Sequence, residues 1–397
     1  MPRTGTVPWM IDQTHDVAVL GLGGIGSAAF AALARRGVDV VGIDRWAPPH
    51  EHGSSHGQSR IFRIAYFEHP DYVPLARASS RLWQELDDRN PERIFVRTGG
   101  AWIGAPDCEI VAGSLLAATR HDLEHELLDA GETSHRWPAL RPPDGSICFH
   151  EADTGVICPE NAIAALIREG REAGGQLRTE TQVDRIDHEG NDIVLETTSG
   201  RISVNRLVVA AGAWSDRLVE LPSVRLQVTR QLLGWVRPRD PEPLREGRLP
   251  VWGFDDEGDS FQYGFPICAG FPGPTGLKFA RHSDGMPCDP DTVRRTIDGD
   301  DEAWLLQHLA ERIPAAEGPL THASTCLYTL SEDRHFVLDV HPDNPSVTIA
   351  CGFSGHGFKF CPILGEALAD LALEGGTKHP IGFLSCGRLK QAGNEGP

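Results

Sequence analysis

An early stretch of the chain alternates between apolar runs and small residues in a pattern typical of a strand, a helix and a second strand. Residues 16–45 read "DVAVLGLGGIGSAAFAALARRGVDVVGIDR". The apolar positions predict a buried strand at Val17–Leu20, a helix at Gly24–Arg36 and another buried strand at Val38–Ile43. Together they form a βαβ unit, which indicates a parallel sheet.

A glycine-rich turn joins the first of these strands to the helix. Gly21, Gly23 and Gly26 form the motif GxGxxG, in which backbone amides and a helix N-terminus can meet a pyrophosphate. Asp44 ends the second strand, where the ribose of a bound nucleotide needs a hydrogen-bond acceptor. Such a motif alone can be a structural turn, but here strand, helix and acid stand in register. We therefore expect a dinucleotide site.

Further patterns predict that the chain returns to the same sheet. Residues 179–204 alternate like an antiparallel meander, with turns at Glu189-Gly190 and Ser199-Gly200. The following run "RLVVAAGAWSDRL", Arg206–Leu218, is typical of a buried parallel strand ending in small residues. We expect an α/β fold with a discontinuous cofactor domain, residues 1–90, 145–220 and 318–397. Residues 91–144 and 221–317 would form a second, mixed-sheet substrate domain of the α+β kind.

Composition narrows the class of protein. The 397 residues include 37 basic and 56 acidic ones, and the net charge of −19 argues against partners such as nucleic acid or anionic membranes. The eighteen uncharged residues from Val17 to Ala34 contain four glycines and match the nucleotide turn better than a membrane span. Nine scattered cysteines lack CxxC or zinc-ligand spacing, so we expect no metal site and a reducing cytoplasm.

Lysine is rare, which draws attention to where it occurs. Only four of the 37 basic residues are lysines. Lys378 and Lys390 stand in a polar tail, whereas Lys278 and Lys359 stand in glycine-rich, aromatic stretches. Lysine supplies a compact charge where arginine supplies a planar fork, so a chain poor in lysine can retain it where a point charge is needed.

Four separate segments hold the candidate site residues. In "GSSHGQSRIFRIAY", residues 53–66, Arg60 and Arg63 would share one face if the stretch were helical, and the alternative is a surface helix with two solvated arginines. On their own, a cysteine and tyrosines like those of the other segments are ordinary core residues. The candidates are His56, Ser59, Arg60, Arg63, Tyr263 of "QYGFP", Lys278 and His282 of "GLKFARH", Cys326 and Tyr328 of "TCLYT", and Gly355, His356, Gly357 and Lys359 of "CGFSGHGFKF".

Taken together, these segments resemble the family of monomeric sarcosine oxidase, N-methyltryptophan oxidase and pipecolate oxidase over nearly the whole chain. "GSSHGQSRIFRIAY", "CLYTLSEDRHFVLD" and "GFSGHGFKF" carry the resemblance because they combine uncommon residues in the same order. The resemblance implies a Rossmann-like FAD-binding domain of the glutathione-reductase and D-amino-acid-oxidase type. It also implies covalent FAD, a secondary or cyclic amino acid as substrate, and O2 as the electron acceptor, with a monomeric enzyme.

The resemblance also assigns roles to residues. Cys326 would be bonded to the flavin 8α-methyl group, and Lys278 would lie near flavin N5, where oxygen reacts. Arg63 and Lys359 would bind the substrate carboxylate, and the remaining candidates would complete the cage or contact the cofactor: Tyr263, Tyr328 and His282 in the cage, and His56, Ser59, Arg60, Gly355, His356 and Gly357 at the flavin. Fixed cations would stabilise both reduced flavin and superoxide. A helix over residues 362–373 would add its positive N-terminus.

Three alternatives remain at this stage. A flavin dehydrogenase on the same fold would pass electrons to another acceptor, although Lys278 near N5 favours oxygen. A nicotinamide-dependent imine reductase would share only the GxGxxG motif and Asp44. A nucleotide-binding module without catalysis would not need cations in two separate aromatic stretches. The stretch between Tyr263 and Lys278 is longer than the family pattern, which leaves the identity of the substrate open.

Overall fold

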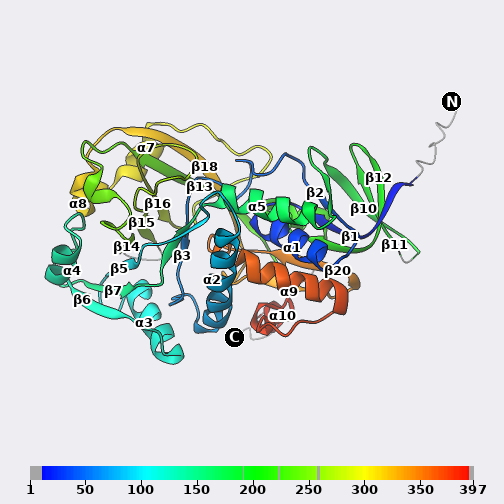
Figure 1. Cartoon of the computed structure of the whole chain (residues 1–397), viewed down its shortest axis with the longest axis horizontal. Coiled ribbons are helices and arrows are strands. Elements are labelled where there is room, and N and C mark those ends of the chain that lie inside the picture. Colours follow the sequence, from blue (N-terminus) through cyan, green and yellow to red (C-terminus); the bar gives the residue numbers. More distant parts are fainter. Residues whose placement is uncertain (1–10, 191, 222–223, 257–259, 393–397) are drawn as a thin grey trace.

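Two large β-sheets and one small sheet organise the molecule (Figure 1). A computed structural model describes residues 11–190, 192–221, 224–256 and 260–392. In Figure 1 the eight-stranded sheet lies on the right with helices beside it, and the nine-stranded sheet lies on the left. The eight-stranded sheet has parallel strands at its centre and antiparallel pairs at its edges, and it adjoins a second mixed sheet, as the sequence predicts. The boundaries of the two domains stay a prediction.

The eight-stranded sheet contains the predicted βαβ unit. β1 (Ile11–Leu20) pairs in parallel with β2 (Val40–Ile43), and α1 (Gly24–Arg35) connects them. β12 (Gly200–Val209) pairs in parallel with β1, so the predicted return of the chain to this sheet is confirmed, although the strand stops at Val209. The remaining strands are β9 (Gln176–Arg178), β10 (Val183–Glu189), β11 (Asp192–Thr197), β19 (Val337–His341) and β20 (Asn344–Cys351).

The predicted meander is also confirmed. β10 pairs antiparallel with β11, and β11 pairs antiparallel with β12. Apolar residues on this face of the sheet form a continuous buried cluster with those of β1 and β2. The alternation of apolar and polar residues in the meander therefore reflects burial on one side of each strand.

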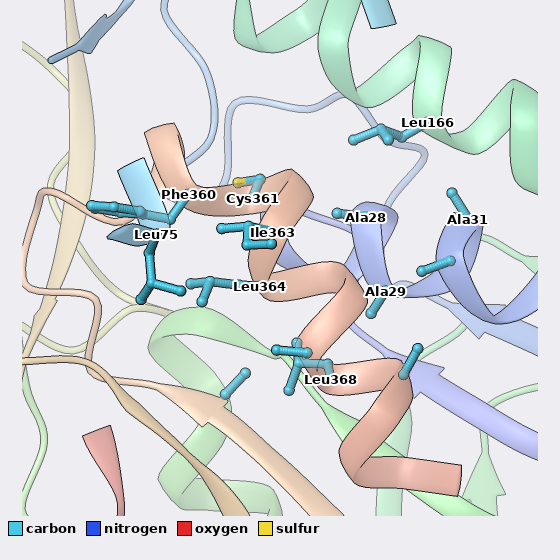
Figure 2. Close-up of a cluster of buried hydrophobic side chains, with 14 of the residues drawn as sticks. Ala28, Ala29, Ala31, Leu75, Leu166, Phe360, Cys361, Ile363, Leu364 and Leu368 are labelled. Carbon is cyan, nitrogen blue, oxygen red and sulfur yellow. The ribbon is translucent and has the colours of Figure 1, made fainter. Parts of the chain in front are cut away.

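Helices α1, α5 (Pro159–Glu172) and α9 (Cys361–Glu374) cover the other face of this sheet (Figure 1). Figure 2 shows Ala28 and Ala29 of α1 at the crossing with α9. A Cβ atom on Gly365 of α9 would lie 2.6 Å from the backbone carbonyl carbon of Ala28, so the two helices approach closely only because residue 365 is glycine. This contact fixes the segment that precedes α9 against the N-terminus of α1.

The nine-stranded sheet carries the predicted site residues Tyr263, Lys278, His282, Cys326 and Tyr328. β13 (Gln227–Val236) and β18 (Leu320–Leu330) pair antiparallel along their length. The other strands are β5 (Gly100–Gly104), β6 (Glu126–Asp129), β7 (Ile147–Glu151), β14 (Val251–Asp255), β15 (Phe261–Gly264), β16 (Leu277–His282) and β17 (Met286–Pro287). The outer helices are α3 (Glu109–His121), α4 (Ala130–Arg136), α7 (Gly299–Leu306) and α8 (Leu309–Arg312).

The small sheet corrects one expectation. β3 (Arg60–Phe62) and β4 (Phe95–Arg97) both pair antiparallel with β8 (Gly155–Ile157). The interpretation of residues 53–66 as a helix is therefore wrong. Gly57 and Gln58 have φ angles of +94° and +71°, which a right-handed helix cannot contain. The helices not yet placed are α2 (Val73–Asp88), α6 (Ser215–Leu218) and α10 (Gly387–Ala392).

Residues Val17–Ala34 lie in β1, the glycine turn and α1. Within the described ranges, no helix has the length and apolar character needed to cross a membrane.

Candidate active site

A cavity of about 370 Å³ lies where the two large sheets meet. Its walls come from the glycine turn after β1, the end of β2, the loop after β12, strand β18 and the turn that follows β20. The predicted site residues among its lining residues are Gly21, Gly23, Asp44, Arg60, Tyr263, Cys326, Tyr328, Gly355 and Gly357. Segments far apart in the sequence thus converge on one space.

The three positions of the motif require glycine for different structural reasons. Gly21 has a φ of +90°, and a Cβ there would lie 2.5 Å from the carbonyl oxygen of Ala210. A Cβ on Gly26 would lie 1.7 Å from the carbonyl oxygen of Gly21, so helix and strand pack directly on each other. Among the described residues, a Cβ on Gly23 would meet the side chain of Ser55 alone, with the hydroxyl at an ordinary 3.4 Å. The protein itself therefore has room for a side chain at residue 23, and its glycine leaves that space to a ligand.

Asp44 stands at the end of β2 with its carboxylate at the cavity wall. It accepts hydrogen bonds from the backbone amides of Leu22, at 2.7 Å, and of Trp46, at 2.9 Å. These contacts tie the glycine turn to β2 and orient the carboxylate. The position is the one that a ribose hydroxyl requires next to such a turn.

The carbonyl oxygen of Ser59 brings two cations together. Lys278 donates from Nζ at 2.6 Å and Arg60 donates from a terminal guanidinium nitrogen at 2.9 Å. Arg60 also donates to the carbonyl of Ser54 at 2.7 Å, and the same nitrogen lies 3.8 Å from Sγ of Cys326. Burial and the charge of Arg60 lower the pKa of Lys278 well below its usual value. An anion in this region would relieve the repulsion between the two cations.

Glu160 holds the loop that presents this carbonyl. Its Oε1 accepts the backbone amides of Gly57, at 2.6 Å, and Gln58, at 3.0 Å, at the two residues with positive φ. The indole of Trp235 donates to the side chain of Gln58 at 2.8 Å. Sequence reasoning missed Glu160, since an acid at the start of a helix, here α5, is usually a capping residue.

Gly26, His56, Ser59 and Lys278 are predicted site residues that do not belong to the described lining of this cavity. The side chains of His56 and Ser59 are buried. Burial and the charge of Arg60 lower the pKa of His56 to about 3, so its ring is neutral at physiological pH. Within the described residues, His56 Nε2 and the Ser59 hydroxyl have no hydrogen-bond partner.

A smaller pocket of about 50 Å³ adjoins the cavity and shares part of its wall. Arg60, Tyr263, Tyr328, Gly355 and Phe358 line both spaces. The smaller pocket is also lined by Arg63 and Lys359, predicted to bind a carboxylate, by His282, predicted for the cage, and by His356, which was predicted to lie at the flavin.

Arg63 is paired with a carboxylate of the protein. Its guanidinium binds Glu68 and donates to the carbonyl of Ala65 at 3.2 Å. It lies 4.1 Å from the centre of the Tyr66 ring and 3.9 Å from that of Phe67. Although burial opposes ionisation of Glu68, the charges of Arg63, His356 and Lys359 lower its pKa to about 2. Sequence reasoning missed Glu68, which lies two residues beyond the end of the segment 53–66.

Lys359 lies on the other side of the same pocket. Its Nζ donates to the carbonyl of His356 at 2.9 Å and lies 3.5 Å from the Tyr66 hydroxyl. The backbone carbonyl of Lys359 accepts hydrogen bonds from Ser79, at 2.5 Å, and from Trp83, at 2.8 Å, which fixes the main chain at this residue. Burial and the charge of Arg63 lower the pKa of Lys359 to about 7.

The glycines of the segment 351–360 allow close packing against aromatic rings. Gly355 has a φ of +82°, and a Cβ there would lie 2.3 Å from the ring of Tyr328. His356 faces Tyr66 rather than the larger cavity, since its Nδ1 lies 2.5 Å from the Tyr66 hydroxyl and its Nε2 lies 3.0 Å from the carbonyl of Arg334. The glycines therefore bring the backbone to the pocket, and His356 supports the pocket from behind.

The aromatic cage is assembled by β15, β16 and β18. His282 Nδ1 lies 3.2 Å from the Tyr328 hydroxyl, and its ring stacks on Phe261 with centroids 4.9 Å apart. Burial lowers the pKa of His282 to about 4 and raises the pKa values of Tyr263 and Tyr328. All three side chains are thus uncharged at neutral pH. Trp252 and Phe254 on β14 are fully buried core residues.

Comparison with known proteins decides the family. A family model described as FAD dependent oxidoreductase matches residues 16–371. This chain belongs to that family. The FAD-dependent oxidoreductase fold predicted from the sequence is thereby confirmed.

Two curated relatives match this FAD-dependent oxidoreductase over nearly its whole length. A monomeric sarcosine oxidase from Streptomyces avermitilis is 40% identical over 385 residues, covering 96% of this chain and 100% of the relative. An N-methyl-L-tryptophan oxidase from Salmonella dublin is 35% identical over 362 residues, covering 90% of this chain and 95% of the relative. The resemblance inferred from the sequence motifs is confirmed.

Solved structures support the fold independently. NikD, an unusual amino acid oxidase essential for nikkomycin biosynthesis, has a TM-score of 0.81 and 24% identity, covering 94% of this chain and 97% of its own. Glycine oxidase from Geobacillus kaustophilus has a TM-score of 0.79 and 22% identity, covering 94% and 98%. At these identities the likeness concerns the fold alone.

The residues of the large cavity fit the cofactor that the family name specifies. Gly23 leaves free space at the N-terminus of α1, where a pyrophosphate is favoured by the helix dipole. Asp44 offers an acceptor beside it, and Arg60 and Cys326 line the same cavity. The donor set therefore matches a dinucleotide that carries an electron-accepting ring.

The open space at Gly23 generates a prediction. Gly23→Ala should leave the thermal stability of the apoprotein nearly unchanged, because the new methyl group meets no protein atom closer than 3.4 Å. It should nevertheless lower the amount of FAD bound, since a methyl group there occupies the path of the pyrophosphate. The FAD content measured by absorbance, together with the melting temperature of protein prepared without flavin, checks both parts.

Gly26→Ala serves as the control. Its Cβ would collide with Gly21, so this variant should destabilise the apoprotein itself. Full FAD content in Gly23→Ala would contradict the assignment of this turn to the cofactor.

Proposed function

We propose that this chain is an FAD-dependent oxidase of small secondary or cyclic amino acids, forming an imine and passing electrons to O2 to give hydrogen peroxide. The observation that carries the proposal is the position of Arg63 and Lys359 around one small pocket adjoining the cofactor cavity. The names of the relatives, monomeric sarcosine oxidase and N-methyl-L-tryptophan oxidase, support this substrate class. The monomeric state and the cytoplasmic location stay predictions.

Bound FAD would supply the acceptor for a hydride from the carbon next to the amine nitrogen. The protein would supply the binding and the orientation of the substrate. Arg63 and Lys359 would bind the carboxylate, with Arg63 exchanging Glu68 for the carboxylate of the substrate. A carboxylate held in this way directs the neighbouring C–H bond toward the shared wall of pocket and cavity, which turns binding energy into positioning.

The cage residues suit an amine that reacts in its neutral form. His282 is uncharged at neutral pH, since burial lowers its pKa to about 4, and Tyr263 and Tyr328 keep their hydroxyl protons. Tyr and His side chains can therefore accept or donate a hydrogen bond at the amine without adding charge. Lys278 and Arg60, which share the Ser59 carbonyl, would stabilise negative charge that develops in the cavity.

The carboxylate site gives a first test. Lys359→Met should raise the KM for an N-methyl or cyclic amino acid by about 10- to 100-fold, since a hydrogen bond to a charged group contributes roughly 1.5–3 kcal/mol. Steady-state release of peroxide measures this. The pKa of Lys359 near 7 adds a second expectation, because loss of its proton removes the charge: the wild-type KM should rise above about pH 7, and this rise should vanish in Lys359→Met.

Glu68→Gln provides the opposing control. Removing the competing carboxylate should lower KM, because Arg63 then meets the substrate without first releasing a partner. The carboxylate site would be ruled out if the enzyme oxidised decarboxylated amines as efficiently as the amino acids. Arg63 and Lys359 would then act on the cofactor alone.

Lys278 decides between an oxidase and a dehydrogenase. Lys278→Met should slow reoxidation of the reduced enzyme by O2 by about 10²-fold or more, as removal of one electrostatic stabiliser typically does. Its anaerobic reduction by substrate should change much less. Stopped-flow absorbance of the two half-reactions measures the difference, and equal loss in both would assign Lys278 to substrate positioning or structure.

Cys326 is the proposed site of a covalent bond to FAD. Wild-type protein precipitated with acid should stay yellow, whereas Cys326→Ser should release its flavin under the same treatment. Cys361→Ser is a matched control, because Cys361 is a buried thiol that lines the same cavity, under the N-terminus of α1. A colourless wild-type precipitate, or release from Cys361→Ser alone, would exclude Cys326 as the attachment site.

A further inference from the structure

The smaller pocket has room for only a small molecule, and a tryptophan, Trp102, forms part of its wall. Its volume of about 50 Å³ corresponds to roughly three to five water positions at ~10–15 Å³ each. Room for so few atoms suits a molecule of the size of N-methylglycine, with little side chain beyond its α-carbon. Trp102 is the largest side chain among the residues that line this pocket.

Trp102 is locked in place by the nine-stranded sheet. It lies on β5 between Gly253 of β14 and Phe149 of β7, and its side chain is fully buried. A Cβ on Gly253 would lie 2.8 Å from the six-membered part of the Trp102 ring. The indole thus occupies the room in which a side chain at residue 253 would otherwise stand, so the glycine and the tryptophan form a matched pair.

The indole also faces the carboxylate-binding residues. The guanidinium carbon of Arg63 lies 5.9 Å from the centre of the Trp102 ring, and Phe265 packs in the same buried cluster. Movement of Arg63 away from Glu68 would leave this wall where it is, because Trp102 is held by its neighbours in the core rather than by Arg63. The part of the wall formed by Trp102 would therefore stay in place when a substrate carboxylate is bound.

We propose that Trp102 is a specificity-determining residue that restricts the substrate to amino acids with a small side chain. This inference rests on the proposed function and names the substrate class within it: N-methylglycine and amino acids of similar size are accepted, and N-methylated aromatic amino acids are excluded. The restriction comes from the shape of the pocket wall. That shape is fixed because the neighbouring strands and the core contacts hold the indole of Trp102 in place.

The test compares two tryptophans. Trp102→Val should raise the ratio of kcat/KM for N-methyl-L-tryptophan to kcat/KM for sarcosine by at least about tenfold, the usual effect of one methylene or more in a tight apolar pocket. Trp252→Val is the matched control. Trp252 lies on the adjacent strand β14, is equally buried, and likewise has an indole N–H without a hydrogen-bond partner among the described residues. It does not belong to the described lining of the pocket, so its loss should leave the ratio unchanged.

Binding measurements keep the inference independent of turnover. Calorimetry of acetate and indole-3-acetate should show that the wild-type enzyme binds only the smaller carboxylate, and that Trp102→Val binds both. If Trp102→Val does not fold, the milder variant Trp102→Phe can be used instead. It should shift the preference between the two carboxylates in the same direction.

Three results separate the possible failures. A wild-type enzyme that oxidises N-methyl-L-tryptophan as efficiently as sarcosine would overturn the inference, as would an equal change of the ratio in Trp102→Val and Trp252→Val. Failure to oxidise any N-methyl or cyclic amino acid would overturn the proposed function instead. In that case the preference between the two carboxylates still decides whether Trp102 sets the size limit.

Discussion

Burial of positive charge between the two large sheets is the constraint on which the site depends. Arg63, Lys278 and Lys359 are each at most 5% exposed, and Arg60 lies beside them. Taking such charges out of water costs several kcal/mol each unless partners compensate. The chain compensates with carbonyl oxygens and one carboxylate: Ser59 for two of the cations, and Glu68 for Arg63.

The conformation of the backbone positions the carbonyl oxygens that bind the cations. The loop 57–59 turns through two residues of positive φ, and Glu160 fixes it by accepting both of their amides. A second carboxylate does the same beyond β3, where the buried side chain of Glu151 accepts the amides of Ile64, at 3.1 Å, and Ala65, at 2.8 Å. Both acids act on the main chain, so they orient the cations indirectly. The result is a concentration of positive charge with fixed geometry, which suits a site where negative charge arrives or develops.

Local sequence patterns predicted the parts of the fold that local interactions decide. The βαβ unit, the meander and helix α9 follow from apolar periodicity and glycine positions, and the structure confirms each. Residues 53–66 were not predictable in this way, because their strand depends on pairing with β8, about a hundred residues later. The roles of Glu68, Glu160 and Trp102 were not predicted either, because they also depend on tertiary contacts. In the sequence each resembles an ordinary surface acid, helix cap or core aromatic. The tertiary structure brings Glu68 and Trp102 to the smaller pocket and Glu160 to the loop 57–58.

The Arg63–Glu68 pair has a consequence for how a substrate is recognised. A carboxylate that entered the pocket would find Arg63 already paired with Glu68, and Lys359 donating to the carbonyl of His356 and to the hydroxyl of Tyr66. Exchange of one carboxylate for another at Arg63 would keep the guanidinium paired, so the large desolvation cost of a free buried guanidinium would not arise, although Glu68 would lose its partner. The same exchange makes binding weaker than the two cations alone would allow, since the energy gained at Arg63 is offset by the energy lost to Glu68. Under the proposed binding of a substrate carboxylate at Arg63, Glu68 would pair with the guanidinium again when the product leaves, which would favour product release.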